Sequence, residues 1–586
     1  MKMITQVLTE KVSDTFEKCG YSKNLGLVTV SDRIDLCQFQ CNGAFAGAKI
    51  YKKSPASIAN DVALMLLKDK MFKKVEIAQP GFINIILTDE YLIEYVGLIS
   101  QDTNLGIPQA DSLETILLDY GGPNVAKPLH IGHLRSAIIG ESLKRLIKST
   151  GRKAISDVHL GDWGLQIGLV IAEFEERNPD WKCFSGTFNS KTDMVTTLST
   201  EVLNEIYPFA SRKSKDSKEF KQKAQAITAE LQKGRAGYIA LWKEIIRVSV
   251  EDLKRNYKKL NVDFDFWYGE SDSEKYIDQL IISLTDKGLL YESEGAMVVD
   301  VSEDLDKAPV PPVIIKKSNN SNIYATTDLA TIIQRQKDFS PDKIWYVVDS
   351  RQSLHFTQVF RCAKKAKLVP AETDLEHLGF GTMNGSDGKP YKTRDGGVMQ
   401  LAELLETVVK TTSDRTNSSY FDTKELKAEV VQKLAIAAIK FGDLINHRLK
   451  DYIFDLDKFL ASEGKTGTFL LYTVARINSV LKKLNCYNSD NICLSNVYTE
   501  VERELLLKII LSGEAFLNAF SEKAPNFICE NAYQLASAFS KFYHENHILH
   551  EPDNSKKKTW ISLCVLTRKM LMKHLDVLGI EAVEFM

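Results

Sequence analysis

Hydrophobic and polar positions divide the chain into three stretches with different repeats. The first stretch combines helical periodicity at residues 4–19 and 55–68 with short runs that are typical of strands. The strand-like runs lie at residues 25–30, 36–41, 75–78 and 82–87. A polar segment at 106–112, which contains a glycine and a proline, then interrupts the pattern. We therefore predict a separate N-terminal α+β domain over residues 1–110.

From about residue 113, short buried strands alternate with longer helical segments. The run 114–119 (ETILLD) predicts a strand, the following apolar stripe predicts a helix, and 153–158 predicts a second strand. This order is typical of a βαβ unit in a parallel sheet. Residues 180–262 are helical and lysine-rich without strand patterns, so we expect an insertion there. Strand-like patterns return at 297–301 and 343–349, and a helix is expected at 356–366.

After about residue 422 every pattern is helical. Apolar residues share one helix face over 426–441, and further helices are expected at 467–484, 497–521, 530–546 and 557–577. Short connections between such segments favour a helical bundle. The predicted fold is thus an α/β domain over 113–422 between the N-terminal α+β domain and an all-α domain over 423–586.

Composition narrows the class of protein without indicating a partner. A hydrophobic content of 44% with 26% charged residues is that of a soluble globular protein, and the longest apolar runs are too short to span a bilayer. The N-terminus predicts no secretory signal. The nine cysteines form no CxxC pair, which argues against structural zinc and favours reduced thiols in a cytoplasmic protein. A net charge of −2 means that any nucleic-acid site must be a local basic surface.

The most informative segment follows the first predicted strand of the α/β domain. His130, Ile131, Gly132 and His133 form the sequence HIGH where a strand turns into a helix. A helix N-terminus has free N–H groups and partial positive charge, which suit a polyphosphate. The two imidazoles can donate hydrogen bonds to phosphorus oxygens, and Lys127 adds a cation. The alternative is that both histidines are ordinary polar residues at a helix start.

Two further segments agree with a nucleotide site. Residues 389–393 (KPYKT) place Lys389 and Lys392 three apart on a glycine-rich loop, where they can neutralise a leaving pyrophosphate. The alternative there is a solvated basic loop. HLGDWG, which contains Gly161, Asp162 and Trp163, follows the second strand, at the sheet edge where parallel sheets bind ligands. Alternatively, it is a helix-entry turn with Asp162 as the N-cap.

Together these segments resemble the class I aminoacyl-tRNA synthetases, and the chain is most similar to the arginyl-tRNA synthetases. HIGH matches the family's nucleotide-binding motif, and KPYKT matches its KMSKS motif except at Pro390 and Tyr391. The resemblance extends through KFGDLINHRLKDYIFD (440–455) to the final LDVLGIEA, and the N-terminal PGFINI resembles the domain that touches the tRNA elbow in relatives. It implies a Rossmann-like catalytic domain over 113–422.

The same resemblance assigns residues to the amino acid. Its arginine-binding positions fall on Asp119, Asn124, Glu270, Tyr324, Asp328 and Gln358. A planar guanidinium with five donors suits carboxylates and a tyrosine wall, which supports these residues only weakly. Asp328 can equally be a helix cap, and Glu270 a solvated surface residue.

In the C-terminal domain, 466–483 resembles the family's anticodon-binding helix. Its polar face carries Tyr472, Arg476, Lys482 and Lys483, which can reach bases and phosphates. The alternative is an ordinary amphipathic helix. The ending VEFM (583–586) differs from the family's usual PERM.

The resemblance implies an enzyme that activates L-arginine with ATP and Mg²⁺ and transfers it to the 2′-hydroxyl of the terminal adenosine of tRNA(Arg). Mg²⁺ would sit on the ATP phosphates, without a metal site of the protein's own, and the enzyme is expected to be a monomer. Three alternatives remain: a synthetase for another amino acid, a small-molecule ligase or nucleotidyltransferase with the HIGH fold, and a catalytically inactive tRNA-binding relative. Both histidines and both loop lysines argue against the last.

Overall fold

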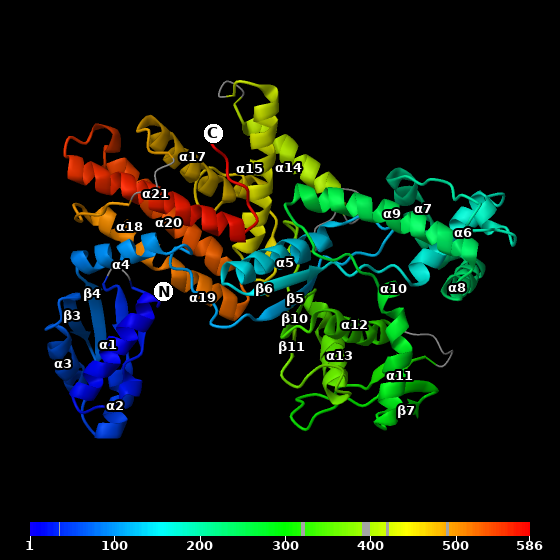
Figure 1. Cartoon of the computed structure of the whole chain (residues 1–586), viewed down its shortest axis with the longest axis horizontal. Coiled ribbons are helices and arrows are strands. Elements are labelled where there is room, and N and C mark those ends of the chain that lie inside the picture. Colours follow the sequence, from blue (N-terminus) through cyan, green and yellow to red (C-terminus); the bar gives the residue numbers. More distant parts are fainter. Residues whose placement is uncertain (34–35, 318–322, 390–398, 418–420, 488–491) are drawn as a thin grey trace.

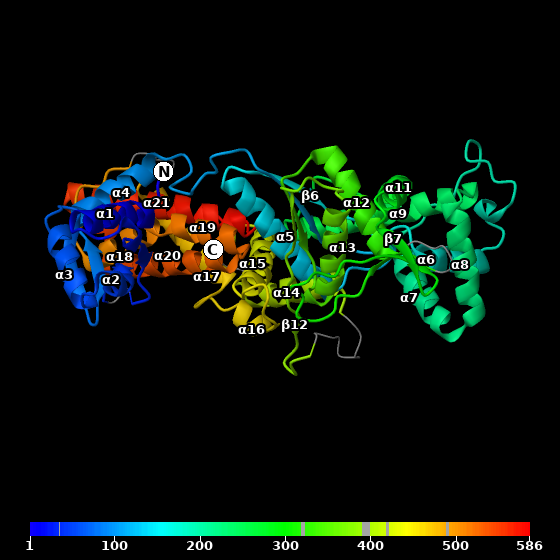
Figure 2. The same cartoon turned by 90° about the horizontal axis from the view of Figure 1, so that it is seen from below.

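The computed structural model describes residues 1–33, 36–317, 323–389, 399–417, 421–487 and 492–586. The molecule is elongated (Figures 1 and 2), with the N-terminal unit and the C-terminal helices at one end and the helical insertion at the other. Within the described ranges no helix is long and apolar enough to cross a membrane.

The N-terminal unit is an antiparallel sheet covered by helices, which confirms the predicted α+β class. The sheet order is β1 (Val28–Val30), β2 (Phe39–Cys41), β4 (Phe82–Leu87) and β3 (Phe72–Ala78). Every second residue of β4 is buried, as expected for a strand with one face on the core. The helices are α1 (Ile4–Lys18), α2 (Gly43–Tyr51), α3 (Pro55–Leu66) and α4 (Asp89–Gln101). The sequence patterns did not predict α2, whose turns are rich in glycine and alanine, or α4.

The central unit contains the predicted parallel sheet, in the order β11 (Asp374–His377), β10 (Lys343–Val347), β5 (Thr115–Tyr120) and β6 (Lys153–Asp157). From β5 the chain passes through α5 (Ile131–Ser149) to β6 on one side, whereas β10 pairs with β5 on the other side. The strand order therefore reverses at β5. In open α/β sheets the crevice at the carboxyl ends of such strands is where ligands bind.

The segments between β6 and β10 contain the insertion and a second sheet. After α6 (Leu165–Arg177), the insertion comprises α7 (Thr200–Asp216), α8 (Lys218–Gln232) and α9 (Ala236–Lys259). The strand expected at 297–301 does not return to the parallel sheet. It forms β8 (Ala296–Val299) of a separate antiparallel sheet with β7 (Leu290–Ser293) and β9 (Val313–Lys316). Local periodicity predicts a strand but not its partner. The helices here are α10 (Glu270–Ser273), α11 (Ile277–Asp286), α12 (Tyr324–Phe339) and α13 (Ser353–Lys365).

The C-terminal part is helical, as predicted. Its helices are α14 (Leu401–Arg415), α15 (Lys424–Leu444), α16 (Leu456–Phe459), α17 (Gly467–Lys483), α18 (Glu500–Ile510), α19 (Ser512–Glu522), α20 (Asn526–Glu545) and α21 (Asn554–Val577). The single helix expected at 497–521 is two helices that break at Leu511. At Gly513, just after the break, a Cβ atom would lie 2.6 Å from the Gly106 carbonyl oxygen, so the N-terminal unit lies directly against this helix.

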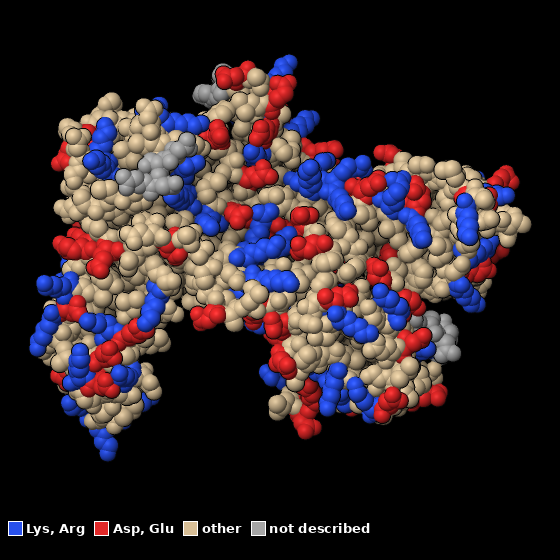
Figure 3. Space-filling view, in the orientation of Figure 1, with Lys and Arg blue, Asp and Glu red and all other residues tan. Residues whose placement is uncertain are grey.

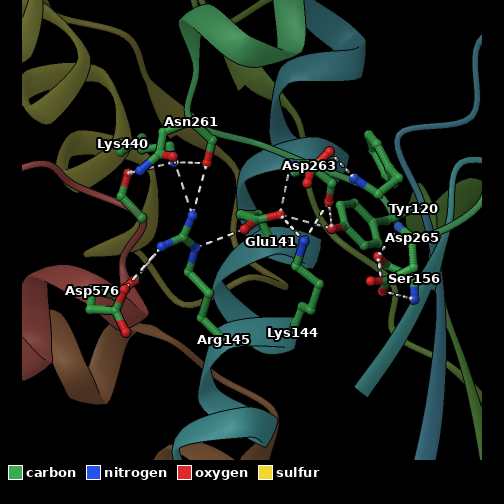
Figure 4. A network of polar contacts seen from close by, with 12 residues as sticks. Tyr120, Glu141, Lys144, Arg145, Ser156, Asn261, Asp263, Asp265, Lys440 and Asp576 are labelled. Atoms are coloured by element: carbon green, nitrogen blue, oxygen red, sulfur yellow. Dashed lines mark hydrogen bonds and ion pairs between the residues drawn. The ribbon is translucent and has the colours of Figure 1, made fainter. Parts of the chain in front are cut away.

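Helix α5 is the common core element of the molecule, because it packs on β5 and β6 and also on α15, α19 and α21. A polar network around its C-terminal half joins these units (Figure 4). The Glu141 carboxylate accepts hydrogen bonds from Tyr120 (2.9 Å) and Arg145 (2.7 Å), and it pairs with Lys144. Arg145 reaches Asp576 beyond the sheet, with 3.0 Å between Nη1 and Oδ1. The central and C-terminal parts are therefore held in one fixed arrangement around α5.

Candidate active site

The two histidines of HIGH lie side by side at the start of α5, and each binds a backbone N–H through its Nδ1. His130 is the N-cap, and its Nδ1 accepts from the Gly132 N–H at 3.1 Å. The Nδ1 of His133 accepts from the His130 N–H at 3.1 Å, and the ring centroids are 3.9 Å apart. A neutral imidazole whose Nδ1 accepts carries its proton on Nε2. Both rings therefore offer an Nε2–H donor.

The surroundings keep both rings uncharged near neutral pH. Burial, together with the charge of Lys127, lowers the pKa of His130 to about 4. Burial, followed by the charges of His130 and Lys127, lowers the pKa of His133 to about 3. Burial also lowers the pKa of Lys127. The site thus combines two neutral donors with one cation.

The first-turn N–H groups of α5 are less available than the sequence suggested. The Ile131 N–H donates to the Met399 carbonyl at 3.2 Å, and that of Gly132 is taken by His130. The His133 N–H donates to the His130 carbonyl at 2.9 Å. The expectation of free N–H groups for a phosphate is therefore wrong for these three residues, because the N-cap and a neighbouring chain segment satisfy them. The donors that remain are the imidazoles and Lys127.

The loop after β6 packs directly on the loop after β5. The Val125 N–H donates to the Gly161 carbonyl at 3.0 Å, and the Gly161 N–H donates to the Pro123 carbonyl at 3.1 Å. A Cβ atom on Gly161 would lie 2.0 Å from Asn124 Oδ1, so a side chain at this position would displace the Asn124 amide. The two motifs thus form one surface at the carboxyl ends of the strands.

Asp162 and Trp163 are both turned into the protein. Gly164, not Asp162, is the N-cap of α6, so the alternative of a helix-capping aspartate is wrong. The Asp162 carboxylate instead accepts from the Ser271 N–H (3.0 Å) and hydroxyl (2.6 Å). Trp163 packs edge-on against Trp242, with ring centroids 5.1 Å apart. Both residues therefore join the motif to α10 and to the insertion.

The loop with the two lysines is attached to the HIGH segment at its far end. The Leu401 N–H donates to the Leu129 carbonyl at 2.8 Å, and Met399 accepts from Ile131 as described above. Lys389 is exposed, and its N–H donates to Asp387 Oδ1 at 3.1 Å. Lys392 lies outside the described residues. The fold therefore brings the end of this loop next to HIGH although 270 residues separate Leu129 from Met399 in the chain.

Three of the residues assigned to arginine gather where α10 meets α12. Glu270 starts α10, with its N–H donating to the Leu160 carbonyl at 3.0 Å, and Tyr324 and Asp328 lie one turn apart on α12. Burial raises the pKa of Glu270 to about 7; the charge of His159 opposes this, and those of Asp162 and Asp328 reinforce it. Asp328 lies in the second turn of α12, whose N-cap is Ile323, so the alternative of a capping aspartate is wrong. Two carboxyl groups therefore lie close to Tyr324 at this junction.

Two other assigned residues are already bonded within the protein. The Asp119 carboxylate accepts from Arg335 Nη2 at 2.7 Å, and Arg335 is only 1% exposed. Gln358 Nε2 donates to the Pro311 carbonyl at 2.8 Å. Asn124, the remaining residue of the set, lies against Gly161. The structure therefore brings Glu270, Tyr324 and Asp328 together, and it bonds Asp119 and Gln358 to other parts of the protein.

Sequence reasoning missed three residues of this region. His159 opens the HLGDWG motif; burial alone would lower its pKa, but the ion pair with Asp157, 3.6 Å between Nδ1 and Oδ2, and the charge of Asp119 raise it to about 9. His355 Nε2 lies 2.6 Å from Asp328 Oδ2, and it stands three residues before Gln358. Arg335 lies two turns after Asp328 on α12. Each could have been found from its position in the sequence. His159 lies in the HLGDWG motif, Arg335 lies on the same helix as Asp328, and His355 lies on the same helix as Gln358.

The residues assigned to tRNA lie on the exposed face of α17. Tyr472 is 41% exposed, and the Arg476 guanidinium covers its ring at 4.5 Å and donates to its hydroxyl at 2.8 Å. Lys482 pairs with Glu584 of the divergent C-terminus at 3.2 Å, while Lys483 is exposed. In the same ending, Val583 is buried. The apolar face of α17 is buried as an ordinary amphipathic helix requires, so only the polar face is available to a partner.

Comparisons with known proteins agree across the whole chain. Family models match at residues 2–87 (arginyl tRNA synthetase N terminal domain), 96–456 (tRNA synthetases class I (R), catalytic domain) and 470–586 (DALR anticodon binding domain). The arginine–tRNA ligase of Alkaliphilus oremlandii is 47% identical over 590 residues, covering 100% of both chains. That of Agathobacter rectalis is 46% identical and covers 99% of each.

Solved structures show the same fold at lower identity. Arginyl-tRNA synthetase from Plasmodium falciparum superposes with a TM-score of 0.82 at 23% identity, and that from Thermus thermophilus with 0.79 at 20%; both comparisons cover 100% of each chain. Full-length identity above 40% to curated relatives, with three family models in the expected order, leaves one assignment. The chain belongs to the arginyl-tRNA synthetase family of class I aminoacyl-tRNA synthetases.

Proposed function

We propose that this arginine–tRNA ligase activates L-arginine at the carboxyl ends of β5 and β6 and transfers it to tRNA(Arg). The arginine carboxylate attacks the α-phosphorus of ATP in line, pyrophosphate leaves, and the arginyl-adenylate forms. The 2′-hydroxyl of the terminal adenosine of the tRNA then takes the arginyl group and releases AMP. Such chemistry depends mainly on positioning and on charge stabilisation, which the side chains of this site can supply.

The observation that carries the proposal is the pair of Nε2–H donors on His130 and His133. Both rings are neutral because their pKa values lie well below 7, and both have Nδ1 occupied by a backbone N–H. A neutral N–H donor can stabilise the negative charge that develops on phosphate oxygens in the transition state, and it does not repel Lys127. We assign His130, His133 and Lys127 to the transition state, and Lys389 and Lys392 to the leaving pyrophosphate.

Around this centre we propose that the backbone at Gly132 and Gly161 lies close to ATP. Asp162 and Trp163 are proposed to fix the loop that contains Gly161. Mg²⁺ is proposed to enter on the ATP phosphates. Among the described residues no group of three or more His, Cys, Asp or Glu side chains is placed to hold a metal ion. Mg²⁺ would supply charge neutralisation on the phosphates.

For arginine we propose that Glu270 and Asp328 receive the guanidinium and that Tyr324 forms a wall beside them. These groups are close enough that the charges of Asp328 and Glu270 raise the pKa values of Glu270 and Tyr324, respectively, in addition to burial. Asn124 is proposed to bind the substrate from the β5 side. Asp119 and Gln358 are proposed to complete the set by supporting the site from within the protein, since their side chains are bonded to Arg335 and to the Pro311 carbonyl.

We propose that three domains, with boundaries near residues 110–113 and 422–423, have separate roles. The N-terminal domain contacts the tRNA elbow, the central domain carries out the chemistry, and the C-terminal helices contact the anticodon. On the face in Figure 3, Lys and Arg are interspersed with Asp and Glu, so charge alone does not mark an RNA surface on this face. We therefore assign anticodon contact to the local group of Tyr472, Arg476, Lys482 and Lys483. The enzyme is proposed to act as a cytoplasmic monomer.

The experiment that tests the proposal is ATP–pyrophosphate exchange with a panel of amino acids, with and without tRNA. Among the amino acids tested, only arginine is expected to support exchange. Canavanine, which keeps most of the guanidinium geometry, should be accepted, whereas the uncharged analogue citrulline should be rejected. Exchange with another amino acid, or with none of them in the presence of tRNA(Arg), would contradict the assignment.

The Asp328→Asn and Glu270→Gln variants should raise the KM for arginine by roughly 10- to 100-fold, while the KM for ATP changes little. The reason is that each removes a charged acceptor from a guanidinium that has left water. Steady-state aminoacylation with one substrate varied at a time measures both constants. Asp338→Asn, an exposed acid on the same helix α12, is the matched control. Equal changes for arginine and ATP would place these acids outside the arginine pocket.

The KM for arginine should also depend on pH through Glu270. Its pKa is raised to about 7, so the free enzyme holds this carboxyl neutral below that pH and ionised above it. Only the ionised form pairs with a guanidinium, so the KM should rise up to about tenfold for each pH unit below 7. Glu270→Gln should give a higher KM with this dependence removed. A variant that keeps the wild-type pH profile would show that another group titrates.

A further inference from the structure

The chain segment just before Lys389 is held from two directions by two arginines, the buried Arg135 and the partly buried Arg448. We call residues 379–384 the loop root. Arg135 Nη1 donates to the Gly381 carbonyl at 2.6 Å, and Arg448 Nη1 donates to the Gly379 carbonyl at 2.7 Å. The loop root therefore does not simply extend from the sheet, because side chains from two other parts of the molecule fix its carbonyl groups.

The loop root is also joined to residues 448–454, which follow α15. The Gly381 N–H donates to the Arg448 carbonyl at 2.9 Å, and the Tyr452 N–H donates to the Thr382 carbonyl at 3.1 Å. The short strands β12 (Met383–Asn384) and β13 (Tyr452–Ile453) pair in parallel as a result. A Cβ atom on Gly381 would lie 2.7 Å from the Lys450 carbonyl carbon and 2.8 Å from the Asp451 nitrogen, so the close approach of the two backbone segments depends on glycine there.

Arg135 is the one residue of this junction that also belongs to the helix with the two histidines. It lies on α5, is 2% exposed, and its Nε donates to Asp443 Oδ2 at 3.0 Å near the end of α15. Nη1 bonds the Lys450 carbonyl at 3.1 Å as well as Gly381. Its guanidinium lies 5.1 Å from the ring centre of Tyr452, whose hydroxyl donates to the same Asp443 oxygen at 2.9 Å.

Stability alone does not account for this arrangement. Arg135 Nη2 and Asp443 Oδ1 are buried, and neither atom has a hydrogen-bond partner among the residues that the structure describes. A buried ion pair that is only partly satisfied stabilises a fold little, and apolar residues of similar volume often do as well or better. What the guanidinium adds is a rigid planar set of donors in fixed directions. Those directions here point to α15, to the loop root and to residue 450.

We propose that Arg135 is a positioning residue that holds the loop root, and with it Lys389, in register with His130 and His133. Because Arg135 sits five residues after His130 on one rigid helix, any movement of its guanidinium relative to Gly381 changes the spacing between the phosphate-binding groups. The same side chain fixes the end of α15 through Asp443. The inference rests on the proposed role of Lys389 and adds the element that places it.

Arg135→Lys tests the proposal, since a lysine keeps the charge but cannot donate along three fixed directions. Single-turnover adenylate formation with saturating ATP, arginine and tRNA should slow by about 10- to 100-fold, as small misplacements of reacting groups do. Hydrogen–deuterium exchange of the peptide spanning 379–389 should become faster, while the KM for arginine stays near the wild-type value. A wild-type rate with wild-type exchange would overturn the proposal.

Arg145→Lys is the matched control. Arg145 lies on the same helix and also joins it to the C-terminal helices, through Asp576 Oδ1 at 3.0 Å, but its partners lie outside the loop root and residues 448–454. Its adenylation rate and the exchange of 379–389 should stay close to wild type. The same slowing in Arg145→Lys would show that any weakening around α5 is sufficient, and would overturn the specific role of Arg135.

A double variant separates positioning from stability. Arg135→Met with Asp443→Leu replaces the pair by apolar side chains, so its Tm should be at least that of Arg135→Met alone, which leaves a buried unpaired carboxylate. Adenylate formation should nevertheless remain slow. A stable double variant with the wild-type rate would overturn the proposal. Lys389→Ala, measured in parallel, distinguishes the role of Lys389 from the role of Arg135. If Lys389→Ala is fully active, the proposed contact of Lys389 with ATP is wrong. The hydrogen–deuterium exchange of residues 379–389 still decides whether Arg135 holds the loop root.

Discussion

His133→Ala is expected to slow arginyl-adenylate formation by about 10²–10³-fold, the usual cost of removing one donor that stabilises transition-state charge. The imidazole has its Nδ1 bonded to the His130 N–H, which leaves the Nε2–H free to donate. A donor used mainly in the transition state affects the rate more than ground-state binding, so the Kd for ATP should change little. Single-turnover kinetics with labelled ATP measure both quantities.

Three controls sharpen this prediction. His544→Ala removes an exposed histidine from α20 and should have no effect on adenylation. His133→Gln keeps an N–H donor and should recover part of the rate. Because the pKa values of His130 and His133 are lowered to about 4 and 3, neither ring should appear in a wild-type pH–rate profile between about 5.5 and 8. An unchanged single-turnover rate in His133→Ala would make the histidine an ordinary capping residue.

Pyrophosphate exchange by the full-length enzyme is expected to be near zero without tRNA and to appear when tRNA(Arg) is added. The resemblance to arginyl-tRNA synthetases motivates the expectation, and the structure supplies a physical route. Residues 448–454 continue from α15 of the C-terminal part and are hydrogen-bonded along the loop root at 379–384. RNA that docks on the C-terminal helices can therefore bias the geometry of the phosphate-binding groups.

The measurement requires nuclease-treated protein and tRNA that is added back in known amounts. A tRNA transcript without its terminal adenosine should also restore exchange, because activation precedes transfer. Removing the chain from about residue 425 would be a poor test, since α5 packs directly on α15, α19 and α21 and would lose its buried contacts. Robust exchange by tRNA-free enzyme would contradict the prediction and the route proposed for it.

The fold class and the family could both be predicted from the order of residues along the chain. Strong periodic patterns predicted the strands at 114–119 and 153–158 and the helices of the C-terminal part, because each carries an apolar face that must be buried. The motif HIGH was recognised as a nucleotide-binding motif because it lies between a predicted strand and turn and a predicted helix. Motifs in the family's order then indicated arginyl-tRNA synthetase, which the comparisons confirm. The individual site residues remain predictions.

Which groups face one another became known from the folded structure, because it depends on long-range packing. Local periodicity could not show that 297–301 pairs in a separate sheet, because strand patterns do not encode partners. It also could not show that the first N–H groups of α5 are already hydrogen-bonded, or that the Asp119 carboxylate accepts a hydrogen bond from Arg335. Arg135 and Asp443 are 308 residues apart, and each alone reads as an ordinary charged residue on a helix. Burial brings them together at the loop root, and a long-range contact of this kind leaves no trace in the spacing of residues along the chain.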